Sequence, residues 1–137
     1  ALSHVVPDLI LKCLEYEDEL EILGEGNQIR HYTYGEDLEK GICTLLTHEN
    51  AKYNDFNLST AQSTSVLELA DIIFKKINPD KELKIKNLEP FTYDVQKRIP
   101  STEKAYNLLG FEAKTTLSDM LDIVIPWVKD AKQKNLY

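Results

Sequence analysis

The chain has 137 residues, of which 42% are hydrophobic and 28% charged, and its net charge is −7 at pH 7. This length fits one domain, residues 1–137, with enough apolar residues to bury a core. The acidic balance excludes a surface built mainly for nucleic acid or anionic lipid, because both require basic patches. No apolar run reaches the roughly 20 residues that a membrane span requires, and no signal-peptide pattern opens the chain, so we expect a cytoplasmic protein.

The first half predicts helices separated by short strands. Pro7 can open a helix that ends near Glu17, because its missing N–H costs nothing in a first turn. Residues 20–23 and 29–34 have the β-branched and aromatic composition of strands, and the glycine-containing turn between them predicts a β-hairpin. A second helix is predicted by an apolar stripe made of Leu38, Ile42, Leu45 and Leu46.

The second half is marked by helix caps. Ser65 and Glu68 have the spacing of a capping box, and the helix behind them stops before Pro79. Gly110 predicts the left-handed end of a short helix, and Thr116 can cap the last helix. Two more short strands are predicted at 56–58 and 83–85. The order α-β-β-α-β-α-β-α-α indicates a mixed α/β fold, with short strands and a hairpin covered by about five helices.

Complete catalytic motifs are absent from the sequence. Gly24-Glu25-Gly26 lacks the third glycine of a dinucleotide fingerprint, and a strand follows it where that motif needs a helix. There is no P-loop, no G-x-S-x-G and no H-E-x-x-H. Three scattered histidines and two cysteines offer no metal-ligand spacing. Cys13 and Cys43 both lie in apolar helical patterns, which predicts buried free thiols, with a disulfide as the alternative.

Two arginines stand out among sixteen basic residues. Arg30 lies in a strand whose alternation places it on one face with Tyr32 and Tyr34, and Arg98 follows Lys97 in a loop before Pro100. A guanidinium can grip a phosphate with two parallel hydrogen bonds, which an ammonium cannot do. The alternative is that each arginine forms an ion pair with one of the many surface carboxylates.

Five blocks of sequence, in order, resemble the extended short-chain dehydrogenases/reductases, the family of NAD-dependent nucleotide-sugar epimerases and dehydratases. The segment from Gly24 to Ile42 is similar to its G-x-G-x-Q-x-R-x-[FY]-x-Y-x-x-D-L-x-x-G-[IL] pattern. The other four blocks are Phe56-Asn-Leu58, Thr64-Ser-Val-Leu-Glu-Leu-Ala70, Arg98-Ile-Pro-Ser-Thr-Glu-Lys-Ala105 and Leu108-Leu-Gly-Phe-Glu-Ala-Lys-Thr-Thr-Leu117. In addition, the opening His4-Val-Val-Pro7 resembles the family's segment just after the active-site half. Ser101 departs from the family's usual Asp, and the loop before Arg98 has no second arginine.

The resemblance implies a fragment of a larger enzyme. The family's N-terminal Rossmann half carries the glycine-rich NAD loop and a Tyr-x-x-x-Lys pair, and we expect both to lie outside this chain. This chain would be the substrate-binding domain, which holds a nucleoside-diphosphate sugar. Its own Rossmann half would perform the isomerase or dehydratase chemistry, and the parent enzyme would be a homodimer. By itself it should be inactive. The implied substrate-binding residues are Arg30, Tyr32, Arg98, Asn57, Val6 and Lys97, with no catalytic, cofactor-binding or metal-binding residue.

A second hypothesis is a stand-alone protein that kept this lobe and binds nucleotides or partners without catalysis. Under the first hypothesis, an apolar surface should remain where the Rossmann half docks, along residues 1–10 and 32–42.

Overall fold

The structure is a computed structural model that describes residues 4–136. Within that range it contains five α-helices and four short strands, which confirms the mixed α/β class. The elements are α1 (Val5–Leu14), β1 (Leu20–Leu23), β2 (Ile29–Arg30), α2 (Gly35–Thr47), a 3-10 turn (Glu49–Ala51), β3 (Thr64–Ser65), α3 (Val66–Ile77), β4 (Ile85–Leu88), α4 (Glu103–Leu109) and α5 (Leu117–Gln133).

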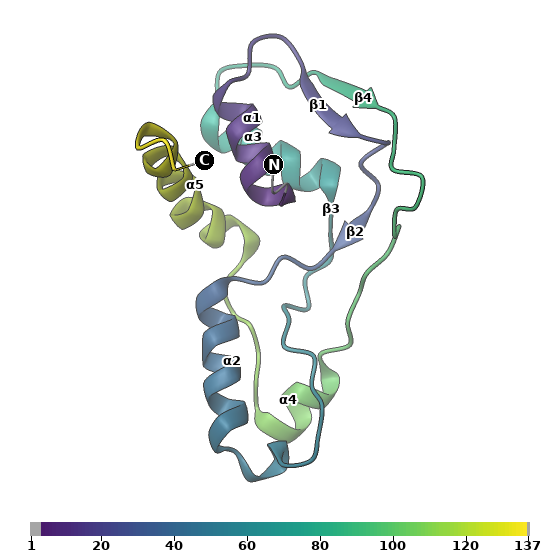
Figure 1. The fold of residues 1–137 in the computed structure, drawn as a ribbon, viewed down its shortest axis with the longest axis vertical. Coiled ribbons are helices and arrows are strands. Elements are labelled where there is room, and N and C mark those ends of the chain that lie inside the picture. The colour runs from purple at the N-terminus through teal and green to yellow at the C-terminus, as the bar shows by residue number, and fades with distance from the viewer. Residues whose placement is uncertain (1–3, 137) are drawn as a thin grey trace.

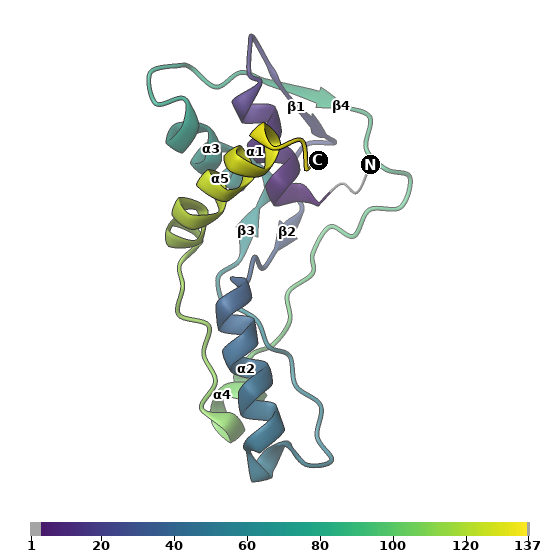
Figure 2. The ribbon, with the colours of Figure 1, turned by 60° about the vertical axis from the view of Figure 1, so that its left-hand side comes forward.

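The molecule is elongated and has two parts (Figures 1 and 2). The upper part contains α1, α3, α5 and all four strands, and the lower part contains α2, α4 and the 3-10 turn. Four connections join the two parts, at residues 31–34, 52–63, 89–102 and 110–116. The candidate binding residues lie mainly in the upper part, where most of the hydrophobic core is found.

The predicted hairpin is wrong. β1 pairs in parallel with β4, and β2 pairs antiparallel with β3, so the two segments expected to form the hairpin belong to different sheets. The turn between them has left-handed backbone at Gly24 and Gly26 (φ 65° and 71°). A Cβ on Gly26 would lie 2.7 Å from the side chain of Leu67. The turn therefore packs against the start of α3, which directs the chain away from β1.

Tyr16 explains why β1 meets β4. Its hydroxyl lies 3.0 Å from the carbonyl oxygens of Asp18 and Glu82, and it accepts a hydrogen bond from the backbone N–H of Lys84. Its ring packs edge-on against Phe74, with the ring centroids 4.7 Å apart. One buried aromatic residue thus joins the segment before β1 to the segment before β4 and fixes both to the core.

Three of the predicted helix ends are confirmed. Ser65 and Glu68 form a reciprocal capping box, Thr116 accepts a hydrogen bond from the Asp119 N–H, and Gly110 ends α4 with a left-handed backbone. The first helix differs from the prediction, since it begins at Val5 and ends at Leu14. Pro7 is tolerated within the first turn of α1 because the first N–H groups of a helix have no partner within it.

The lower part has a small core. Only Ala105, Leu109 and Phe111 are buried in its cluster, and Leu45, Phe56 and Leu58 pack against them. The predicted strand at residues 56–58 does not form, because no other strand of residues 4–136 lies beside it to complete a ladder. The apolar stripe of α2 is correspondingly open: Leu38, Ile42 and Leu46 are 38%, 47% and 80% exposed.

The prediction that both cysteines are buried holds only for Cys13. Cys43 is exposed on α2, where its thiol donates to the Glu39 carboxylate, and both cysteines are free. Burial raises the pKa of the Cys13 thiol to about 12, since a thiolate is disfavoured away from water. The pKa of Cys43 is raised mainly by its hydrogen bond to Glu39.

These environments predict two thiols of different reactivity. At pH 8, a thiol-reactive reagent such as Ellman's reagent should modify Cys43 in the folded chain, whereas Cys13 should react only after denaturation. The Cys43→Ser variant serves as the control, because it should show no accessible thiol until it unfolds. Rapid modification of two equivalents in the native protein would contradict this assignment.

A second prediction concerns the contact between α2 and Phe111. A Cβ on Gly41 would lie 2.7 Å from the Phe111 ring and 3.0 Å from Leu58, so Gly41→Ala should lower the free energy of unfolding by about 1–3 kcal/mol. Gly35, in the same helix, has no atom within 4 Å of such a Cβ, and Gly35→Ala should be neutral or stabilising by up to about 1 kcal/mol. Urea unfolding followed by circular dichroism measures both, and equal effects would argue against close packing at Gly41.

Candidate functional site

The chain after β2 sends its side chains alternately to two faces. The ring nitrogens of His31 lie 2.7 Å from the Thr60 carbonyl oxygen and 2.9 Å from the Ser63 hydroxyl, and the Thr33 hydroxyl accepts from the Thr60 N–H. These contacts direct one face toward residues 59–63. Arg30 and Tyr32 point to the opposite face, as the sequence alternation predicted, and there they line a pocket. Tyr34, which was predicted on the same face, does not line this pocket and lines a separate hollow.

The pocket lies between α1, β1 and β2 and has a volume of about 210 Å³; it is called the α1–β2 pocket below. Leu9, Ile22 and Val66 supply apolar walls, and Arg30 and Tyr32 are among its polar groups. Burial raises the pKa of the Tyr32 phenol, and the nearby Arg30 charge opposes that shift. The phenol is therefore neutral at physiological pH.

Two polar atoms at this pocket lack partners. The Tyr32 hydroxyl and Gln28 Oε1 are buried and have no hydrogen-bond partner among residues 4–136. Buried polar atoms are usually satisfied, because leaving one unpaired costs about 1–3 kcal/mol. Unpaired atoms beside a pocket are therefore consistent with a site that is completed by a ligand.

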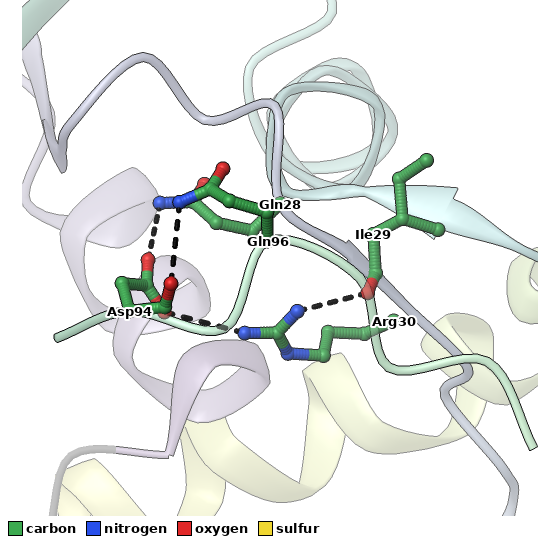
Figure 3. Close-up of polar contacts among 5 residues, drawn as sticks. All are labelled: Gln28, Ile29, Arg30, Asp94 and Gln96. Atoms are coloured by element: carbon green, nitrogen blue, oxygen red, sulfur yellow. Dashed lines mark hydrogen bonds and ion pairs between the residues drawn. The ribbon is translucent and has the colours of Figure 1, made fainter.

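Arg30 is held by a carboxylate (Figure 3). Its Nη2 lies 3.3 Å from Asp94 Oδ1, and its Nη1 donates to the Ile29 carbonyl oxygen at 2.9 Å. The other oxygen of Asp94 accepts from Gln28 Nε2 at 2.7 Å. One carboxylate thus bridges the two donors. The ion-pair alternative raised for Arg30 is observed, but inside a pocket and not on an open surface.

Backbone pairing places Arg98 beside Arg30. Ile29 donates its N–H to the Gln96 carbonyl oxygen and accepts from the Arg98 N–H, which forms a parallel bridge between Ile29 and Lys97. Arg30 and Arg98 each follow a bridge residue, so their backbones lie on neighbouring segments, but Arg98 is not among the residues that line the α1–β2 pocket. Arg98 is exposed and has no side-chain ion pair among the described residues, and Lys97 is exposed as well.

The other predicted residues lie at varying distances from this pocket. Val6 lines a separate apolar hollow that shares Tyr32 with the α1–β2 pocket. Asn57 belongs to the connection between the two parts, where its side chain donates to the Ser101 carbonyl oxygen. The structure therefore places Arg30 and Tyr32 at one pocket, while the assigned roles of all six residues in substrate binding stay predictions.

Sequence reasoning missed three polar residues. Asp94 and Gln28 hold each other and Arg30, as described above. Gln28 belongs to the segment from Gly24 to Ile42 that resembles the family pattern, and its place in that pattern could have identified it. Asp94 lies in an irregular loop, and no sequence pattern marks it. Asp37 is buried at the start of α2, where its carboxylate accepts from the Thr115 N–H at 2.8 Å and joins α2 to the segment before α5.

Neither catalytic groups nor metal ligands gather in the described part of the chain. A Tyr-x-x-x-Lys spacing does occur, at Tyr93 and Lys97, which corrects the expectation that the chain lacks it. Both residues are exposed and lie outside any helix, so they do not share a helix face as residues i and i+4 would. No group of three potential metal ligands is present among residues 4–136, and none of the helices there is long and apolar enough to cross a membrane.

Residues 2–124 match the family model described as GDP-mannose 4,6 dehydratase. Among curated proteins, the chain is 32% identical over 133 residues to UDP-glucuronic acid decarboxylase 4 of Arabidopsis thaliana, covering 96% of this chain and 28% of that protein. The chain therefore spans less than a third of the length of this relative.

Solved structures agree in fold. The chain is similar to UDP-glucuronic acid 4-epimerase of Bacillus cereus, determined in complex with UDP-glucuronic acid and NAD, with a TM-score of 0.83 and 25% identity over 93% of this chain and 40% of that one. An epimerase from Methanothermobacter thermautotrophicus, at 21% identity over 97% of this chain and 39% of that one, shares the fold with a TM-score of 0.85. The chain belongs to the extended short-chain dehydrogenase/reductase family of nucleotide-sugar epimerases and dehydratases.

Proposed function

We propose that this chain is the nucleotide-sugar binding lobe of an NAD-dependent epimerase, dehydratase or decarboxylase. In this proposal it binds the nucleoside diphosphate and positions the sugar, while a Rossmann half outside this chain holds NAD and performs the hydride transfer. Binding energy from the nucleotide, far from the reacting carbon, would serve to orient the sugar over the cofactor.

The observation that supports this function best is the composition of the α1–β2 pocket. Its apolar walls suit the flat faces of a nucleobase and ribose, and Arg30 supplies a permanent positive charge at a half-buried position. The unpaired Tyr32 hydroxyl and Gln28 Oε1 are available to hydroxyl or N–H groups of the ligand. In this proposal Arg98, on the segment that pairs with Ile29, makes a second contact with the phosphates.

The proposal also explains the open surface of the lower part. Leu38, Ile42 and Leu46 repeat every four residues and form one exposed apolar face of α2. Residues 56–58 have no strand partner among residues 4–136, and Leu58 lies beside Gly41 of α2. In a complete enzyme the Rossmann half would cover this face and pair with this segment. Of the predicted docking residues, 1–3 lie outside the described range. Leu9 and Ile10 are buried in the core, so these two residues offer no exposed docking surface.

The first test of this function is Arg30→Ala in the full-length enzyme that carries this lobe. Calorimetric titration with UDP should show affinity reduced about ten- to a hundredfold, because a charge-assisted hydrogen bond of roughly 1.5–3 kcal/mol is lost. Lys76→Ala is the matched control, since it removes one positive charge from a remote ion pair with Asp122. Unchanged UDP affinity in Arg30→Ala would leave Arg30 as a structural ion pair only.

A separate prediction concerns the apolar face of α2. The 137-residue chain should bind a hydrophobic dye and self-associate, and Ile42→Glu with Leu46→Glu should reduce both, because the two changes interrupt the exposed stripe. Tyr53→Glu changes a residue that is 95% exposed away from this stripe and should leave dye binding unaltered. Sedimentation of a strictly monomeric parent chain without dye binding would contradict an uncovered docking surface.

A further inference from the structure

The loop between β4 and the Ile29–Lys97 bridge crosses the α1–β2 pocket. Residues 89–95, called the strap, are fixed at both ends: the Leu88 carbonyl accepts from the Gly24 N–H, and the Gln96 carbonyl accepts from the Ile29 N–H. Between these ends, Phe91 and Asp94 line the pocket. The strap therefore lies where a ligand entering the pocket would have to pass or settle.

Asp94 is the strap's polar attachment to the body of the protein. Among residues 4–136, it is the one strap residue whose side chain forms hydrogen bonds or an ion pair, and both of its carboxylate oxygens are used. Phe91, Tyr93 and Val95 are exposed. Figure 3 shows that the Asp94 carboxylate accepts from Gln28 and Arg30 and that the Asp94 backbone carbonyl oxygen accepts from Gln96 Nε2. The first two contacts attach the strap to the segment around β2.

The geometry of these contacts is that of an anion in a binding site. Two oxygens of one negatively charged group accept hydrogen bonds from the Gln28 amide and the Arg30 guanidinium, which lie two residues apart at β2. A phosphate presents the same pattern of oxygens and carries at least as much charge. Gln28 is 8% exposed, so its amide is presented to this position and hardly to solvent.

We propose that the Asp94 carboxylate occupies the phosphate position of this pocket, so that a nucleoside diphosphate must displace it, and that Gln28 is a second phosphate-binding residue beside Arg30. This inference rests on the proposed function. Its physical basis is competition: two anions cannot share one guanidinium and one amide, and the apparent affinity for ligand falls by the fraction of molecules in which the site is free. The pocket volume of about 210 Å³ is small for a ligand site, which agrees with a strap that partly fills it.

Displacement would also move Phe91. Because the strap is fixed at Leu88 and Gln96, release of Asp94 frees the segment between them without disturbing the backbone contacts of Ile29. Arg98, which follows the second fixed point, would keep its place beside Arg30. The phosphate site would therefore open by movement of the strap, while the two arginines stay in register.

The test compares UDP with uridine in the full-length protein that carries this chain. Asp94→Asn should bind UDP about tenfold more tightly than the parent, because the competing charge is removed, while uridine affinity changes less than twofold. Asp122→Asn is the matched control: it makes the same change in net charge at a remote ion pair with Lys76 and should leave UDP affinity unaltered. Asp94→Ala provides a second neutral variant if the first does not fold.

Gln28 is tested in the Asp94→Asn background. Gln28→Met keeps the length of the side chain and removes its amide, so the double variant should lose about fivefold of the gained UDP affinity and none of the uridine affinity. If Gln28 serves only to hold Asp94, the added change will have no effect, which would overturn its assignment as a phosphate ligand.

The possible outcomes distinguish a failure of this inference from a failure of the proposed nucleotide-binding function. UDP binding by the parent protein with no tightening in either Asp94 variant would overturn the competition and leave the nucleotide-binding function standing. Equal tightening for UDP and uridine would also overturn it, since that pattern indicates a loosened strap and no phosphate competition. Failure of the parent and of all Asp94 variants to bind UDP would overturn both proposals.

Discussion

The backbone of Ile29 is the contact on which the arrangement of the site depends. Ile29 pairs with Ser65 on one side and with Lys97 on the other, so three segments distant in sequence meet at one residue. Its carbonyl oxygen also accepts a hydrogen bond from the Arg30 guanidinium. Because the pairings with Ser65 and Lys97 are main-chain contacts, they position the backbone of both arginines independently of the surrounding side chains.

The other elements that form the pocket are held in place around this junction at Ile29. The turn at Gly24 and Gly26 returns the chain from β1 to β2 and packs on α3, so that α1, β1 and β2 enclose a common space. Tyr16 holds β1 against β4 at the upper end, and β4 leads directly into the strap. The two sheets fix the ends of residues 89–95, and Asp94, near the end of this short irregular segment, is thereby brought to Arg30.

The sequence predicted the features that depend on neighbouring residues and failed for those that depend on residues distant in the chain. The caps at Ser65, Gly110 and Thr116 were correct, because a cap depends on the few residues around it. The hairpin was wrong because strand pairing is decided by distant partners, here β4 and β3. A glycine turn between two apolar runs has the same local pattern whether or not the runs pair with each other.

The candidate site shows the same division. Arg30 and Tyr32 were found because alternation along an extended segment is a local property, and the structure keeps them on one face. Asp94 could not be found, since its partners Gln28 and Arg30 lie more than 60 positions away in an unrelated element. The strand predicted at 56–58 failed for a different reason: its residues are suited to a ladder, but no strand of the described chain reaches them.

The unequal size of the two cores has a consequence for how the molecule opens. The upper cluster buries fifteen hydrophobic residues and the lower cluster three. Local opening requires only the loss of the contacts that hold a region, so the lower part will unfold at a smaller free energy than the whole and will behave as a separate cooperative unit. α2 and α4 would then exchange their amide hydrogens through partial opening, while α1 and α3 exchange only through global unfolding. A partner that covers α2 would raise the stability of the lower unit first, and binding would be thermodynamically linked to its folding.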